Sequence, residues 1–279
     1  MFKKWVLTGV SFETLTNFRG KRVSESSLWR HFNIFLDNPP SPKPLKARKE
    51  IYLKVDGTYF GKWGCALVYK EGRNKIYWNF VLRETYFNYL SDLSRIKRLG
   101  YDILGVTSDW HGGLVSAIST AYFDTPHQRC LVHTKRLCRS LLTRKPETQA
   151  GMDLLEIAKL LTQVKTHQEK RIWILWLKRF EERYTNLMNQ RTYPLDLNSK
   201  KKWWYTHKKL RRAFRTFKIS IPNLFIYLDN PNIEKDTNGL ESEFSHLKEK
   251  LGNHRGLKRE KKENFIRWYF YLKSPYLKN

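Results

Sequence analysis

The sequence predicts an α/β protein with a mixed β-sheet, and three observations support this fold class. Apolar residues alternate with other side chains through residues 51–56, which is the two-residue period of a strand. Residues 85–99 carry apolar side chains along one helical stripe, and Gly100 follows as a helix stop. Strand-like and helical segments then alternate, which is the order expected of a sheet with helical connections. The expected elements are strands at 51–55, 65–69, 76–82 and 103–107, helices at 85–99 and 113–122, and a short strand that leads into Cys130.

A large excess of basic side chains accompanies this pattern. The 279 residues include 53 Lys and Arg but only 26 Asp and Glu, so the formal charge is +27. A charge of this size must lie on the surface and favours a polyanionic partner, with nucleic acid ahead of an anionic membrane. The longest apolar run, residues 172–177, is too short to cross a membrane. Because three cysteines give no disulfide framework and no signal-peptide pattern is present, we expect a cytoplasmic protein.

Three short helical patterns precede the sheet, within residues 1–38. Ser11 and Ser24 stand where helix N-caps are expected, and a glycine-containing turn separates the last two helices. This arrangement suits a helix-turn-helix module whose third helix enters the DNA major groove. An ordinary helical cap on the next domain is the alternative. The basic residues expected to contact phosphates in this module are Lys21, Arg22 and Arg30.

The rest of the chain divides by composition. Residues 39–50 hold four prolines, which indicates an extended linker. Residues 135–235 are basic and helix-rich, with strand-like alternation only at 224–228. Two further helices are expected at 239–251 and 263–272, on either side of a basic stretch. The expected domains are the helix-turn-helix module at 1–38, the linker at 39–50, the first part of the sheet domain at 51–134, an all-helical basic insertion at 135–235, and the last helices of the sheet domain with a basic tail at 236–279.

In a chain with few acids, two carboxylates follow hydrophobic strands. Asp56 comes at the end of the first expected strand, and Asp109 at the end of the fourth. Carboxylates at the ends of neighbouring central strands point into a common crevice, where they can share a divalent cation. The alternative is that each is a turn residue or a helix N-cap. The strand order favours the shared site when the two residues are considered as a pair.

Four short motifs occur in a fixed order along the chain. They are K-V-D-G-T at 54–58, T-S-D-W at 107–110, C-L-V-H at 130–133 and T-N-G-L-E-S at 237–242. This ordered set resembles bacterial insertion-sequence transposases of the Mutator-like superfamily, which are DDE recombinases with a ribonuclease H-like catalytic fold. The resemblance covers roughly residues 50–272. It implies a ribonuclease H-like five-stranded sheet flanked by helices and interrupted by the all-helical insertion.

The same resemblance implies that Asp56, Asp109 and Glu241 form a catalytic triad that holds two Mg²⁺ ions, with Mn²⁺ as a substitute. In phosphoryl transfer, one metal lowers the pKa of the attacking water or 3′-hydroxyl, and the other stabilises the leaving oxygen. Two other carboxylates compete for the third position. Glu243 lies two residues further along the expected helix and should face away from Glu241, while Asp236 precedes that helix and would cap it.

Cys130 and His133 have three interpretations. The resemblance makes both active-site residues, with His133 near the scissile phosphate. With His127 and Cys138 they form a series of His and Cys residues that could instead ligate Zn²⁺. The third interpretation is a half-buried cysteine beside a hydrogen-bonding histidine.

The segment 200–218 combines nine basic residues with aromatic side chains and contains no carboxylate. Basic side chains there would follow DNA phosphates, and an aromatic ring could stack on an unpaired base. The alternative places the two tryptophans in the core of the insertion. Basic residues within 246–259 would add phosphate contacts beside Glu241. The DNA-binding residues expected in these segments are Lys201, Lys202, Trp203, Trp204, Lys208, Lys209, Arg211, Arg212 and Arg255.

The residues and the resemblance predict a DNA transposase that cleaves and joins strands at insertion-sequence ends with Mg²⁺. Its expected partners are double-stranded DNA, both as terminal repeats and as target, and a second copy of the chain. No membrane partner is expected, and the expected location is the nucleoid of a bacterial cytoplasm. The alternatives are a catalytically inactive or truncated, domesticated descendant that only binds DNA, and a metal-dependent nuclease. Relatives often carry additional DNA-binding sequence before the first helix, so the chain is also consistent with a shortened version.

Overall fold

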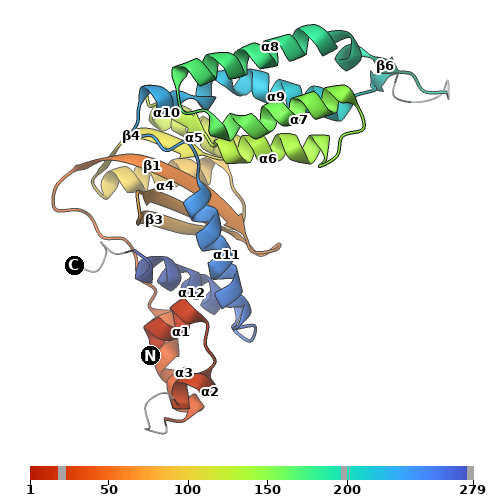
Figure 1. The fold of residues 1–279 in the computed structure, drawn as a ribbon. Coiled ribbons are helices and arrows are strands. Elements are labelled where there is room, and N and C mark those ends of the chain that lie inside the picture. The colour runs from red at the N-terminus through yellow and green to blue at the C-terminus, as the bar shows by residue number, and fades with distance from the viewer. Residues whose placement is uncertain (18–22, 196–199, 201, 275–279) are drawn as a thin grey trace. The chain divides into compact units, whose positions relative to one another are not determined.

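The computed structural model describes residues 1–17, 23–195, 200 and 202–274 of the chain. The chain forms two compact units: the first contains Met1–Pro126 and Thr237–Asn279, and the second contains His127–Asp236 (Figure 1). In sequence, the second unit is therefore inserted into the first. Among the helices that the structure describes, none is both long and apolar enough to cross a membrane.

A five-stranded mixed sheet with the strand order β3-β2-β1-β4-β5 confirms the predicted α/β class. The strands are β1 (Lys49–Tyr59), β2 (Cys65–Glu71), β3 (Asn74–Val81), β4 (Tyr101–Ser108) and β5 (His127–Arg129). β2 pairs antiparallel with β1 and β3, whereas β4 pairs parallel with β1. Each predicted strand up to residue 129 corresponds to an observed one. β1 already begins at Lys49, within the segment expected to be a linker.

Helices cover both faces of the sheet in the first unit. α4 (Tyr86–Arg98) and α5 (Gly112–Ala121) pack on the face that carries Val55 and Tyr69. α11 (Asn238–Gly252) and α12 (Arg259–Leu272) pack on the opposite face, which carries Val68 and Trp78. Figure 1 shows α4 and α11 on opposite sides of β1. The two faces differ because successive side chains of a strand point to opposite sides of the sheet.

Three N-terminal helices share a core with the last helices of the chain. α1 (Phe2–Thr8), α2 (Phe12–Thr16) and α3 (Glu25–Asp37) all form, and Ser11 and Ser24 cap the second and third as expected. Phe2 and Trp5 are buried in one cluster with Phe265 of α12, and the rings of Trp5 and Phe265 lie 5.3 Å apart. This aromatic packing joins the start of the chain to its C-terminal segment.

The second unit is a helical bundle with one short β-ribbon. Trp173 of α8 packs edge-on against Phe217 of α9 and against Phe225 in the buried core. The strands β6 (Arg191–Thr192) and β7 (Trp204–Tyr205) pair antiparallel, so the prediction of an all-helical insertion is wrong at this point. The helices are α6 (Leu131–Leu142), α7 (Gln149–Leu160), α8 (His167–Asn189), α9 (Lys208–Leu224) and α10 (Ile226–Asp229).

The strand-like segment expected at 224–228 is helical instead. Leu224 is the last residue of α9, and α10 begins two residues later. Leu224 and Phe225 are both buried in the bundle core, and the Tyr227 backbone N–H donates to Gln128 Oε1 at 3.2 Å. A short apolar run does not distinguish a strand from a buried helix by its period. Packing within the bundle therefore determines the structure here.

Candidate active site and nucleic-acid surfaces

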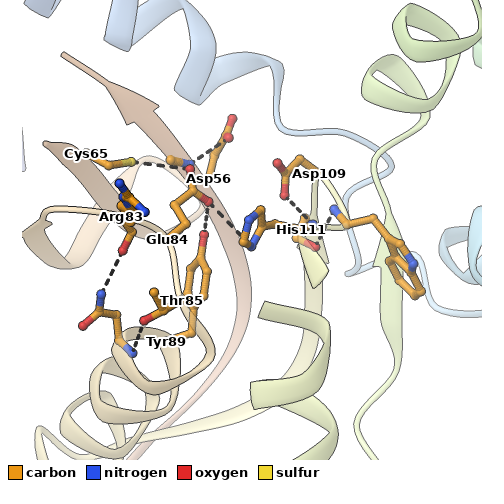
Figure 2. Close-up of polar contacts among 12 residues, drawn as sticks. Asp56, Cys65, Arg83, Glu84, Thr85, Tyr89, Asp109 and His111 are labelled. Atoms are coloured by element: carbon orange, nitrogen blue, oxygen red, sulfur yellow. Dashed lines mark hydrogen bonds and ion pairs between the residues drawn. The ribbon is translucent and has the colours of Figure 1, made fainter. Parts of the chain in front are cut away.

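Asp56 and Asp109 come from two neighbouring parallel strands of the first unit. The register pairs Val55 of β1 with Ser108 of β4, so the next residue along each strand is one of the two aspartates. Adjacent strands lie ~4.8 Å apart. The prediction that the two carboxylates come from neighbouring strands is therefore confirmed, and Figure 2 shows both residues with the side chains around them.

Asp56 does not end its strand, although the sequence predicted that it would. Residues 57–59 continue β1 and pair with β2, whereas β4 ends at Ser108. Directly after Val55, β1 is thus no longer paired with β4, but it remains paired with β2. Asp56 lies at this opening and is 5% exposed, and Asp109 is half-buried.

Each aspartate accepts a hydrogen bond from a backbone N–H group that follows it. The Gly57 N–H donates to Asp56 Oδ1 at 2.9 Å, and the His111 N–H donates to Asp109 Oδ1 at 3.0 Å. Between Asp109 and His111, Trp110 has a φ of 75°, a left-handed conformation that bulky residues seldom adopt. Strained backbone of this kind clusters at functional sites. The turn interpretation therefore fits Asp109, whereas Asp56 and its donor Gly57 both lie within β1.

Glu241 lies in the first turn of α11 and is half-buried. Asp56 is paired with Val68 across β1 and β2, so their side chains lie on the same face of the sheet. α11 packs Leu240 into the same buried cluster as Val68. Glu241 is therefore carried by the helix that covers the face from which Asp56 projects.

Glu243 binds two buried lysines. Its carboxylate lies 3.0 Å from Lys75 Nζ and 3.7 Å from Lys70 Nζ, and the Lys75 side chain is fully buried. Burial lowers the pKa of Lys75, and the nearby Glu243 carboxylate opposes this effect. These ion pairs give Glu243 a structural role. The sequence suggested that Asp236 caps α11, but the N-cap residue is Thr237.

Asp56, Asp109 and Glu241 carry the type of ligand that a hard divalent cation prefers, and the two aspartates come from neighbouring strands. Carboxylate oxygens are the ligands that Mg²⁺ and Mn²⁺ prefer, and Asp56 and Asp109 each come one residue after the last shared pair of β1 and β4. Within the ranges that the structure describes, no three His, Cys, Asp or Glu side chains are grouped to hold an ion. The three-carboxylate metal centre therefore stays a prediction.

Glu84 is a further carboxylate at this site that sequence reasoning missed. It lies between β3 and α4, its side chain is 8% exposed, and its Oε2 stands 4.0 Å from His111 Nδ1. Figure 2 shows it together with Asp56 and Asp109. A signal was available, because Glu84 sits between a strand and a helix, in the same kind of position as Asp109.

Cys130 and His133 lie in the second unit, at the start of α6. Cys130 is the buried N-cap residue, and its Sγ lies 3.5 Å from the His133 backbone N and 3.2 Å from His133 Nδ1. Burial lowers the pKa of His127 to about 4. The Cys138 thiol donates instead to Ala213 O at 3.7 Å, and burial raises its pKa to about 12. Since no metal-holding group occurs among the residues described, the zinc interpretation has no support.

The β-ribbon of the second unit carries exposed aromatic and basic side chains. Trp203 and Trp204 are 37% and 42% exposed, so the alternative that placed them in the core is wrong. The Arg191 guanidinium covers the Trp203 ring at 4.1 Å, and Arg211 covers Tyr205 at 4.0 Å. Of the basic residues expected to bind DNA, Lys21, Arg22 and Lys201 lie outside the described residues, and the exposed ones are Arg30, Lys202, Lys208, Lys209, Arg212 and Arg255.

A second basic surface lies in the first unit, beyond Asp56 along β1. A hollow of about 440 Å³ is lined there by aromatic side chains and by three basic ones. Lys248 also lies over the Phe60 ring at 5.7 Å. The main lining residues are Tyr59, Phe60, Trp63, Lys248, Arg255 and Lys262. We call this surface the basic hollow.

Residues 79–197 match the family model described as "Transposase, Mutator family", which confirms the resemblance to this family over that range. Among solved structures, the fold is similar to one described as "Drosophila P element transposase strand transfer complex". That similarity has a TM-score of 0.44 and 10% sequence identity, and it covers 99% of this chain and 92% of that chain. No curated protein matches the sequence.

Proposed function

Since residues 79–197 carry the match to the Mutator family of transposases, we propose that this protein is a DNA transposase that cleaves and joins strands at transposon ends. The observation that carries the proposal is the position of Asp56 and Asp109, each one residue beyond the last shared pair of β1 and β4. Carboxylates on neighbouring strands suit phosphoryl transfer on DNA, because that reaction needs cations held beside the reacting phosphate.

Asp56, Asp109 and Glu241 are the proposed ligands of Mg²⁺ or Mn²⁺. Bound there, such ions would lower the pKa of the attacking water or 3′-hydroxyl and stabilise the leaving oxygen. The protein itself holds the aspartates through the N–H groups of Gly57 and His111. The strand order and the parallel pairing of β1 with β4 support a ribonuclease H-like assignment for the sheet.

The DNA is proposed to contact several basic surfaces of the chain. In the first unit these are the basic hollow and α3, which would serve as the recognition helix of a helix-turn-helix module and carries the exposed Arg30. In the second unit the ribbon and the start of α9 expose basic and aromatic side chains. We also propose that His133 lies beside the scissile phosphate and that the protein acts as a dimer on paired transposon ends.

The proposal is tested by incubating the purified protein with supercoiled DNA and with linear candidate transposon ends, in Mg²⁺ or Mn²⁺ and in EDTA. We expect nicks with 3′-hydroxyl ends and joined products only in the divalent cation. DNA binding without any cleavage would favour the non-catalytic alternative. Nicking of every DNA without joining would favour the nuclease.

Removing one charge from the basic hollow is expected to weaken DNA binding in a salt-dependent way. Each phosphate contact contributes ~0.9 to the slope of log K against log salt concentration, so Arg255→Ala should reduce that slope by about 0.9. Fluorescence anisotropy at several salt concentrations measures it. Lys178→Ala is the matched control, because Lys178 is exposed on α8, pairs with Glu182 and is not among the residues that line the basic hollow. A slope equal to that of the parent would remove Arg255 from the DNA interface.

A further inference from the structure

The Glu84 carboxylate is buried in the loop between β3 and α4. Thr85, not Glu84, caps α4, since its hydroxyl accepts the Asn88 N–H at 3.3 Å. Tyr89 donates its hydroxyl to Glu84 Oε2, and the Cys65 thiol donates to Glu84 Oε1 at 3.4 Å. These contacts, which Figure 2 shows, hold the carboxylate in one orientation.

Both donors keep their protons at neutral pH. Burial, and then the neighbouring Glu84 carboxylate, raises the pKa of Tyr89 far above its usual range, and the same two causes raise the pKa of Cys65. A buried carboxylate is costly unless it is hydrogen-bonded. The two neutral donors reduce this cost, but they do not cancel the negative charge of a carboxylate.

Glu84 lies against the two backbone segments that hold the aspartates, one in β1 and the other in the turn after β4. On one side is Gly57, where an added Cβ would stand 2.8 Å from Glu84 Oε1, so a larger residue there would displace the carboxylate from its present position. The Gly57 N–H is the donor to Asp56 Oδ1. On the other side is His111, whose Nδ1 lies 4.0 Å from Glu84 Oε2 and whose backbone N–H donates to Asp109 Oδ1. One buried carboxylate thus touches the two residues that orient Asp56 and Asp109.

We infer that Glu84 is a positioning residue for the cation site: it supports Gly57 of β1 and the turn at His111, whose N–H groups orient Asp56 and Asp109. The inference rests on the proposed function, because it concerns the cations that those aspartates would hold. The Glu84 carboxylate beside Asp56 and Asp109 also favours cation binding. A bound positive ion offsets the repulsion between like charges in a partly buried site. Partners behind the ligands of a metal typically contribute ~10–100-fold to affinity.

The test is Mn²⁺ binding to the whole 279-residue chain without DNA, measured by electron paramagnetic resonance. Glu84→Gln keeps the shape of the side chain and removes its charge, and we expect it to weaken Mn²⁺ binding by roughly 10-fold or more. Tyr89→Phe removes one donor to Glu84 and should weaken binding less. Asp92→Asn is the matched control: Asp92 is also buried and accepts hydrogen bonds from Tyr69 and Asn79, so this variant loses a buried carboxylate elsewhere on α4.

The outcomes separate this inference from the proposed function. If Asp109→Ala loses Mn²⁺ while Glu84→Gln and Asp92→Asn both bind it like the parent, the role of Glu84 is wrong and the proposed site stands. If Glu84→Gln and Asp92→Asn lose affinity equally, Glu84 acts only through general stability, and the inference is overturned. If the parent binds no Mn²⁺, or binds it as well as Asp109→Ala does, the cation site fails and the inference fails with it.

Discussion

Replacing Asp109 with Ala is expected to reduce Mg²⁺-dependent strand cleavage by at least ~10³-fold. A cation bound beside the reacting phosphate supplies several kcal/mol of charge stabilisation, and about 4 kcal/mol corresponds to ~10³-fold in rate. Asp56 and Asp109 each come one residue after the last shared pair of β1 and β4, so the loss of Asp109 removes one of the two proposed ligands from this position. DNA binding should change little, because the basic surfaces stay intact.

The measurement compares cleavage of random-sequence DNA and of candidate terminal repeats by the parent and by Asp109→Ala. The matched control is Asp102→Ala, which removes a carboxylate from the opposite end of the same strand. Asp102 lies near the start of β4, where it pairs with the exposed Arg48 at 2.7 Å. We expect this control to cleave like the parent. Equal cleavage by Asp109→Ala and the parent would show that the triad assignment is wrong.

Replacing Glu243 with Ala is expected to destabilise the first unit by about 3 kcal/mol. The reason is the fully buried side chain of Lys75, which would lose a carboxylate at 3.0 Å and keep a charge away from water. Lys70 would lose a second, longer ion pair. Removing one member of a buried ion pair costs more than the pair itself contributes, because the remaining charge stays buried and uncompensated.

Urea unfolding followed by tryptophan fluorescence measures this effect. Adding Lys75→Met to Glu243→Ala should restore much of the lost stability, since the double variant leaves no uncompensated charge at position 75. Glu249→Ala provides the control, because Glu249 lies on the same helix but pairs with Lys250 on the surface. Equal stability of Glu243→Ala and Glu249→Ala would contradict the structural role of Glu243.

The order of strands and helices in the first unit could be predicted because each element has a clear hydrophobic period. The same periods drew attention to Asp56 and Asp109, since each comes directly after an apolar stretch of the sequence. The continuation of β1 beyond Asp56 could not be predicted, because it depends on pairing of residues 57–59 with β2. Glu84 was missed for a related reason. Its relation to Gly57 and His111 arises only when strand β1, the β3–α4 loop and the β4–α5 loop come together in the fold.

The second unit was predicted less well. The ribbon of β6 and β7 consists of two residues on each side, too few to show an alternation. At Leu224 and Phe225 the apolar run reflects burial in the bundle, not a strand. The exposure of Trp203 and Trp204 could likewise not be predicted, because large aromatic residues next to a helix are usually buried in the core of the protein.

The shared core of α1, α3 and α12 also has a consequence for synthesis of the protein. Phe2 and Trp5 are translated long before Phe265, yet they are buried against it. At ~5–20 residues per second, their partner follows only after the whole second unit has been translated. Glu241 arrives on the same late segment. A nascent chain would therefore carry Asp56 and Asp109 early, but gain its third carboxylate and its closed N-terminal core in the same late step.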